Sequence, residues 1–235
     1  MGEIIDGFLE AITLIITMDP EIMEIAGRSI YVSSLATLAA ALIAIPIGAL
    51  IYYYDFHGKR TIINIVQTLY ALPTVIVGLL VYLLVSNSGP FGPLKLLYTT
   101  NAMIIAQVIL VSPLIIGLSI AALSSLDKEM KYTTMALNAR AYRAILTLVR
   151  EAKFAILSAV VLAFGRAIAE VGAVMMVGGN IRHFTRTLTT AITLNTSMGE
   201  FSTSIALGII LLTIALIVNF GVNYFQHSNG RMKDD

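Results

Sequence analysis

The residues most suited to chemistry in this sequence are two opposite charges inside an otherwise apolar segment. Arg166 and Glu170 are four positions apart in the run RAIAEVGAVMMVGGN, a spacing that predicts two side chains on one helix face, able to form an ion pair. Pairing lowers the cost of placing both charges in a membrane. Two interpretations stay open: the pair lines or braces a translocation route, or it locks its helix to a neighbour. Small residues of this segment, Gly172 among them, would let a helix of this chain or of a second copy approach closely.

A polar segment over residues 178–203 follows, and it is rich in groups that bind anions. Backbone amides, hydroxyls and guanidinium groups are what an anion or a docked protein would meet there. A solvated connecting loop is the alternative interpretation. The candidate residues of this segment are Gly179, Asn180, Arg182, Arg186, Thr187, Thr189 and Thr190.

Motifs for catalysis and for nucleotide binding are absent from the sequence. It has no G-x-x-x-x-G-K-[ST] phosphate loop, no H-E-x-x-H pair and no G-x-S-x-G turn, so the energy for any transport must come from another subunit. Zero cysteines exclude thiolate zinc sites, and His57, His183 and His227 are too scattered to suggest a metal site. We therefore expect no catalytic residue, metal or cofactor in this chain. A net charge of +1 gives no nucleic-acid-binding footprint.

The elements that must position these residues are membrane-spanning helices. The chain is 57% hydrophobic and 12% charged, whereas a soluble domain carries about 25% charged residues. Its apolar runs are continuous rather than alternating and long enough to cross roughly 30 Å of hydrocarbon, which favours helices over a barrel. We predict an all-α bundle of about five spans that forms one domain over residues 1–235 in a lipid bilayer. The spans are expected at about 29–54, 62–85, 102–123, 154–177 and 204–225, with Pro46, Pro73 and Pro113 as candidate kinks in the first three.

Residues 3–18 precede these spans. The apolar stretch within them is too short to cross a membrane comfortably. Acidic residues at positions 3, 6 and 10 fall on roughly one helical face. We predict a helix that lies in the membrane interface, with a sixth span as the alternative.

Basic residues set the expected orientation, because those near span ends are retained on the cytoplasmic side. Only Arg28, Lys95, Arg182 and Arg186 fall on one side of the five-span arrangement. Residues 127–153 and the C-terminus are therefore expected in the cytoplasm, and residues 178–203 and the N-terminal helix outside. The ten basic residues of the cytoplasmic side are Lys59, Arg60, Lys128, Lys131, Arg140, Arg143, Arg150, Lys153, Arg231 and Lys233.

The cytoplasmic segment 127–153 is polar, yet apolar residues are interleaved along it, so it has something to bury against. Asn138 lies between two helix-forming halves and tolerates a left-handed turn well, which predicts two short helices joined there. Such a pair could dock on a partner protein. An amphipathic loop lying on the lipid headgroups is the alternative.

This segment resembles the cytoplasmic loop of permease subunits of ATP-binding-cassette (ABC) importers, whose E-A-A-x-x-x-G signature docks on the ATPase. Aligning the run ALNA at 136–139 with the family's alanine, leucine, glycine and alanine places the run YTT at 132–134 at the E-A-A positions. Asn138 then replaces the glycine. The docking residues implied by the resemblance are Tyr132, Thr133, Thr134, Ala136, Leu137, Asn138 and Ala139.

The run from Arg166 to Asn180 resembles the R-x-x-x-E-x-G-A…G-N pattern of molybdate, tungstate and sulfate permeases, and its continuation IRHFTRTLTTAI looks closest to the tungstate-type branch. The resemblance covers residues 28–225. It implies a type I importer permease with a MetI-like core, in the inner or cell membrane of a prokaryote. Implied partners are a second copy, a cytoplasmic ATPase dimer that binds ATP and magnesium, and an external oxyanion-binding protein.

The implied cargo is tungstate or molybdate, with sulfate or phosphate as alternatives, because in this family selection lies mainly with the binding protein. The alternative function from another class is an ion- or proton-coupled secondary transporter that uses Arg166 and Glu170 as a relay. No inverted internal repeat of the kind common in such transporters is visible in the sequence.

Overall fold

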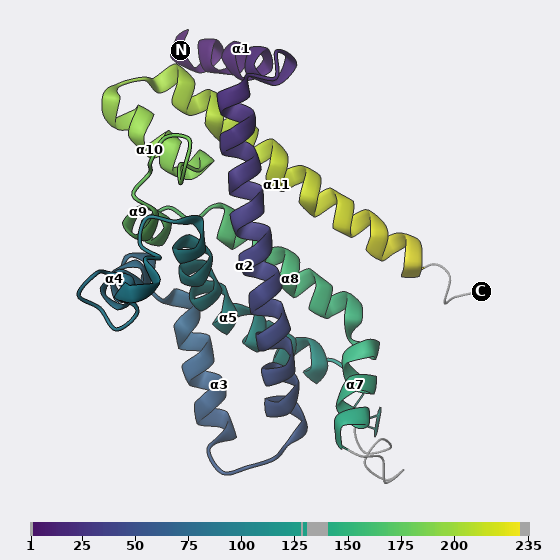
Figure 1. The fold of residues 1–235 in the computed structure, drawn as a ribbon. Helices are drawn as coiled ribbons and strands as arrows, with labels where there is room; N and C mark the ends of the chain where they lie inside the picture. The colour runs from purple at the N-terminus through teal and green to yellow at the C-terminus, as the bar shows by residue number, and fades with distance from the viewer. Residues whose placement is uncertain (1, 128, 131–140, 231–235) are drawn as a thin grey trace.

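The computed structural model describes residues 2–127, 129–130 and 141–230. Every regular element in these residues is helical, which confirms the all-α prediction. Three helices are long and apolar enough to cross a membrane: α2 (Pro20–Tyr53), α5 (Thr100–Ser124) and α11 (Phe201–Gly230) (Figure 1). The 34 residues of α2 give it a length of about 50 Å, so its two ends mark the two ends of the bundle.

Two further apolar helix pairs are bent sharply at a short break. Helix α3 (Lys59–Thr68), continued by the 3-10 turn η1 (Leu69–Ala71), meets α4 (Thr74–Val85) at an angle of 95°. Helix α8 (Lys153–Ile168) meets α9 (Gly172–Gly178) at 58°. If each bent pair is one span, the described residues hold up to five spans, in agreement with the sequence. The second and fourth predicted spans are therefore each two helices at an angle.

Pro73 explains the first of these breaks. Proline lacks the backbone N–H that a helix needs, and it disfavours a helical conformation at the residue before it. Leu72 accordingly adopts φ −58° and ψ 124°. Pro46 and Pro113, by contrast, lie inside α2 and α5 without ending either helix. The second break contains no proline, so its cause must lie in contacts with other elements.

Small residues bring the central helices together. Buried alanines on α2, including Ala36, Ala40 and Ala44, pack in the clusters shared with α5. A Cβ placed on Gly48 of α2 would lie 2.8 Å from the Ile116 carbonyl oxygen of α5. Glycine at this position therefore permits a close approach of the two backbones, as in other membrane helix pairs.

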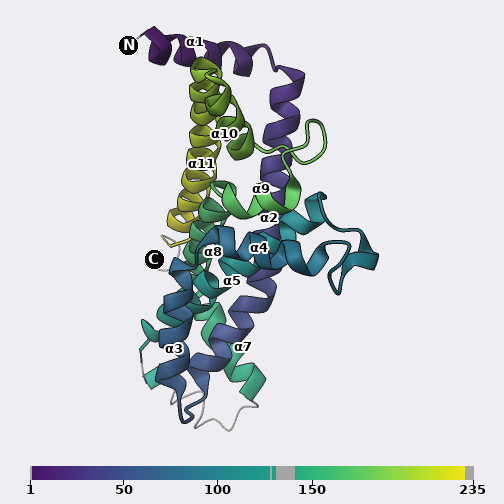
Figure 2. The ribbon, with the colours of Figure 1, turned by 90° about the vertical axis from the view of Figure 1, so that its left-hand side faces the viewer.

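Helix α1 (Gly2–Ile16) lies across one end of the bundle, while the turn between α2 and α3 lies at the other end (Figures 1 and 2). It packs on the start of α11: Ala11 is fully buried, and the Thr203 hydroxyl donates a 3.0 Å hydrogen bond to Glu10 Oε1. The predicted N-terminal helix thus exists. Its exposed apolar residues, among them Ile5, Phe8 and Ile12, suit the interfacial position, which stays a prediction.

Two connecting segments contain helices of their own. Helix α10 (Leu188–Met198) occupies the centre of residues 178–203, which the sequence analysis treated as a polar loop. It begins at a capping box formed by Thr187 and Thr190 and ends at Gly199, which has a φ of +84°. A short 3-10 turn, η2 (Gly92–Leu94), lies between α4 and α5.

Helix α7 (Ala141–Glu151) forms the last part of the predicted docking segment, at the end of the bundle opposite α1 (Figure 1). Its Ala144 and Leu148 are buried in a cluster with Ala49 and Tyr53 of α2 and Leu123 of α5. This is the burial that the interleaved apolar residues predicted. The predicted docking residues from Tyr132 to Ala139, with the turn at Asn138, lie outside the described residues.

Candidate functional site

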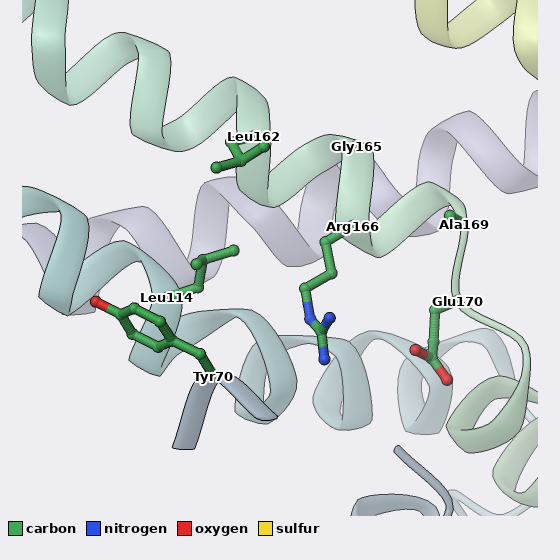
Figure 3. Close-up of a pocket in the computed structure, with 7 residues that line it drawn as sticks. All are labelled: Tyr70, Leu114, Leu162, Gly165, Arg166, Ala169 and Glu170. Carbon is green, nitrogen blue, oxygen red and sulfur yellow. The ribbon is translucent and has the colours of Figure 1, made fainter. Parts of the chain in front are cut away.

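The two broken spans meet at a cavity of about 560 Å³. The first break contributes Tyr70 of η1, and the second contributes Ala169 and Glu170 (Figure 3). Interrupted helices are tolerated in a membrane protein where the freed backbone lines a cavity or is buried in protein, and this cavity is such a place. Its lining residues are Tyr70, Leu114, Leu162, Gly165, Arg166, Ala169 and Glu170.

Arg166 is the cation of this cavity, and its side chain has no partner among the residues that the structure describes. Figure 3 shows its guanidinium extending into the cavity from the last turn of α8. No ion pair or hydrogen bond within the described part of the chain involves this side chain. An arginine in an apolar span usually finds a partner. A free one on a cavity wall is therefore available to bind an anion.

The Arg166–Glu170 ion pair predicted from the sequence is not formed. Helix α8 ends at Ile168, so the two residues are not on one continuous helix, and their four-residue spacing no longer places them on one face. Glu170 is 7% exposed, and its Oε1 accepts a 3.0 Å hydrogen bond from the Ala173 N–H in the first turn of α9. A carboxylate at a helix N-terminus is favourable. The structure thus uses Glu170 to cap α9 and leaves Arg166 free.

Two side chains from distant elements satisfy the backbone at this break. The Gln107 Nε2 of α5 donates a 3.0 Å hydrogen bond to the Ala167 carbonyl, and the Thr189 hydroxyl of α10 donates a 2.8 Å bond to the Glu170 carbonyl. Both side chains are buried, at 2% and 6% exposed. Carbonyls at the end of a helix need such partners when no water reaches them. Gln107 was not among the residues predicted from the sequence, where its signal was an uncharged polar residue inside an apolar run.

The threonines of the predicted anion-binding segment face the interior of the chain. Thr187, Thr189 and Thr190 are buried. The Thr187 N–H donates to the Thr190 hydroxyl at 2.9 Å, and the Leu188 N–H donates to the Ser29 hydroxyl of α2 at 2.8 Å. These hydroxyls start α10 and attach it to α2. They are not the free groups that an open loop would offer to an anion.

Gly179 and Asn180 make the turn that ends α9. Their φ angles are +72° and +51°, in the left-handed region that glycine and asparagine tolerate best. A Cβ on Gly179 would also lie 2.8 Å from the ring of Tyr98. The Asn180 Nδ2 donates to the Thr190 carbonyl at 3.3 Å. The glycine–asparagine pair of the motif is therefore explained by backbone geometry at this turn.

The turn at residues 181–187, between Asn180 and α10, is held by a group of charged residues that we call the outer clamp. It lies at the end of the bundle where α2 begins. We define it as Glu21, Glu24 and Arg28 of α2 with Arg182 and His183 of the turn. The Arg182 guanidinium donates to both Glu21 carboxylate oxygens, at 2.8 and 2.6 Å, and this hydrogen-bonded partner raises the pKa of Arg182 above its usual value. The His183 Nδ1 lies 2.8 Å from Glu24 Oε2. The turn is thus tied by charge to the start of α2.

Arg28 is the least exposed member of the outer clamp, and the sequence analysis had counted it only as a basic residue. Its guanidinium donates 3.0 Å hydrogen bonds to the carbonyls of His183 and Arg186, and its side chain is 12% exposed. The Arg186 side chain lies 3.8 Å from Glu21. The predicted anion-binding arginines of this segment, Arg182 and Arg186, therefore both have a carboxylate partner in the chain.

Metal ligands do not gather anywhere in the described residues: no three His, Asp or Glu side chains come together in a way that could hold an ion. Among the described residues, the site is thus a cavity with the Arg166 guanidinium, which has no partner there, a tyrosine and a carboxylate engaged as a helix cap. Such a set can bind an anion in passing.

Comparison with known proteins places this geometry in context. The family model "Binding-protein-dependent transport system inner membrane component" matches residues 40–230. The tungstate uptake system permease protein TupB of Peptoclostridium acidaminophilum is 42% identical over 93% of this chain and 96% of its own length. The protein of the same name from Campylobacter jejuni is 40% identical over 92% of this chain and 91% of its own length.

Among solved structures, an inward-facing MetNI methionine ABC transporter contains a similar chain, with a TM-score of 0.72, at 15% sequence identity. The match covers 90% of this chain and 97% of that chain. At this level of identity the likeness concerns the fold. It agrees with the type I, MetI-like core that the sequence resemblance implied.

Proposed function

The chain belongs to the family of inner membrane components of binding-protein-dependent transport systems, and from this premise we propose that it carries tungstate or molybdate into a prokaryotic cell as the permease of an ABC importer. It is a multi-pass component of the transport system. Both relatives described above are permeases of tungstate uptake systems and match this chain over most of its length, which supports tungstate over sulfate or phosphate as the cargo.

The observation that carries the proposal is the unpaired Arg166 in the cavity where both broken spans meet. A guanidinium can hold two oxygens of a tetrahedral oxyanion at once, and such charge-assisted bonds are about twice as strong as neutral ones. A single cation also suits a carrier, because several would retain the anion. Arg166 is proposed as a transient contact for the anion on its route through the membrane.

The cavity lies open on one chain, and three to five spans are too few to enclose a route. A second copy of the chain is proposed to close it. The chain carries no phosphate-binding loop, so a cytoplasmic ATPase dimer, with ATP and magnesium, is proposed to dock on residues 127–153. An external oxyanion-binding protein is proposed to dock at the other end, near α1 and the outer clamp. The likeness in fold to a chain of a solved ABC transporter supports this arrangement.

The test is reconstitution of the permease with its ATPase in liposomes, with the binding protein and tungstate supplied outside the vesicles on the side of α1. Uptake measured by elemental analysis should require ATP, magnesium, the ATPase and the binding protein. Molybdate should compete with tungstate, and sulfate and phosphate should compete weakly. Uptake by the permease alone, driven by an ion gradient and independent of nucleotide, would identify a secondary transporter and contradict the proposal.

A further inference from the structure

The break between α8 and α9 has no covalent cause. Residues 167–171 contain neither proline nor glycine. The residues beside Glu170 are close to helical: Ala169 has φ −84° and ψ −1°, and Val171 has φ −119° and ψ −55°. Both neighbours lie in the right-handed helical region, so a change of the Glu170 dihedrals together with adjustments at its neighbours would join α8 and α9 into one helix. The local sequence permits both a broken and a continuous form.

The two forms treat Arg166 differently. In a continuous helix the carbonyls of Ala167 and Glu170 would each accept a bond from the N–H four residues later, and Arg166 and Glu170 would lie one turn apart on the same face. Glu170 would then pair with the guanidinium. In the broken form Glu170 caps α9 through the Ala173 N–H, and Arg166 has no partner in the described residues.

Two buried side chains favour the broken form. Gln107 occupies the Ala167 carbonyl from α5, and Thr189 occupies the Glu170 carbonyl from α10. These are two of the carbonyls whose i→i+4 bonds the break gives up. The Ala167 carbonyl also accepts a 3.2 Å bond from the Glu170 N–H, and Thr189 is the donor to the Glu170 carbonyl within the described residues. The amide oxygen of Gln107 has no partner in the described residues. The bond from its Nε2 to the Ala167 carbonyl is therefore the one hydrogen bond of this side chain among those residues.

We propose that Gln107 and Thr189 are positioning residues for transport, which hold the α8–α9 break so that Glu170 stays engaged as a helix cap and Arg166 stays free for the oxyanion. The inference rests on the proposed function in taking Arg166 as the anion contact. Loss of either hydrogen bond shifts the segment toward the continuous helix. Glu170 then competes with the oxyanion for Arg166.

The test is a rescue experiment in liposomes that hold the complete importer, with ATP-driven tungstate uptake as the readout. Thr189→Val removes the hydroxyl at nearly constant volume and should lower the maximal rate about two- to tenfold, the range expected from one hydrogen bond. Thr189→Ser keeps the hydroxyl and should transport normally. Thr193→Val is the matched control, because the Thr193 hydroxyl bonds only to the Thr189 carbonyl within α10.

The discriminating variant adds Glu170→Gln to Thr189→Val. A glutamine oxygen can still accept from the Ala173 N–H, but it cannot neutralise Arg166. The maximal uptake rate of the double variant should therefore recover to within about twofold of the rate of Glu170→Gln alone, since the two changes are coupled. A double variant as slow as Thr189→Val, or slower, would show that the hydroxyl supports only the fold.

If Thr189→Val does not assemble with the ATPase, the same pair of measurements on Gln107→Leu, with and without Glu170→Gln, decides the question. Different results contradict the proposed function and the positioning role. Nucleotide-independent uptake by the wild-type chain contradicts the proposed function. Normal ATP-driven uptake by the wild-type chain without rescue by Glu170→Gln contradicts only the positioning role.

Discussion

Gly78 of α4 faces the backbone of Ala173 in α9, so closely that a Cβ on Gly78 would lie 2.8 Å from the Ala173 Cα. This contact joins the second halves of the two broken spans beside the cavity. Because the obstructing atom belongs to the backbone, it cannot turn aside as a flexible side chain could. The two half-helices can therefore keep their present distance only with glycine at position 78.

Gly78→Ala should destabilise the protein by about 1–3 kcal/mol, the usual cost of overpacking a close contact. Gly208→Ala in α11 is the matched control, because a Cβ there meets no atom within 4 Å; this change should be neutral or slightly stabilising. Thermal unfolding of both variants in detergent measures the difference. Equal melting temperatures would show that α4 and α9 separate easily.

Arg166→Ala should lower ATP-driven tungstate uptake about 10- to 100-fold, which corresponds to the loss of a charged hydrogen-bond donor. Its melting temperature should change little, because Arg166 has no partner in the described residues and its removal leaves no carboxylate unpaired. Uptake and thermal unfolding are measured on the same preparation. A loss of stability that Glu170→Gln reverses would show that the two residues pair after all.

Arg28→Met should lower the free energy of local opening of residues 181–187 by about 1–3 kcal/mol. The reason is that it leaves the carbonyls of His183 and Arg186 without the guanidinium donor. Hydrogen exchange of the backbone amides in residues 181–187 reports this opening. Arg182→Met is the comparison: its side chain is 61% exposed, and an exposed ion pair contributes little to stability. A larger effect from Arg182→Met than from Arg28→Met would contradict this division of roles.

Single cysteines test the orientation against a clean background, because the chain has none of its own. Ser197→Cys, exposed on α10, should react with a membrane-impermeant maleimide from outside intact cells. Ser125→Cys, exposed after α5, should react only after the cells are opened. The basic residues near the span ends are the reason for this expectation. Labelling of Ser125→Cys in intact cells would reverse the topology.

Asn138→Gly should be tolerated and Asn138→Val should impair coupling to the ATPase, because glycine accepts a left-handed turn and a β-branched residue does not. This prediction comes from the sequence alone, since Asn138 lies outside the described residues. The measurements are copurification of the ATPase and transport-linked hydrolysis. Normal hydrolysis in the Asn138→Val variant would argue against a turn at this position.

The sequence by itself determined the long apolar helices and pointed to the family. Apolar length is a local property, so the predicted spans at 29–54 and 102–123 agree with the ends of α2 and α5 to within a few residues, apart from the early start of α2 at Pro20. That start depends on a local cap as well, because Asp19 accepts bonds from the Glu21 and Ile22 N–H groups. The motif from Arg166 to Asn180, together with the segments on either side of it, indicated the family that the match over residues 40–230 shows.

Only the tertiary structure decided where the spans break and which charges pair. Three prolines looked alike in the sequence, yet only Pro73 ends a helix, while α8 ends at Ile168 without any proline. The reason is that a broken helix must satisfy its freed carbonyls. The side-chain donors to the Ala167 and Glu170 carbonyls come from residues 60 and 19 positions away. A four-residue spacing predicts an ion pair if the helix continues; whether it continues depends on side chains that only the fold brings near.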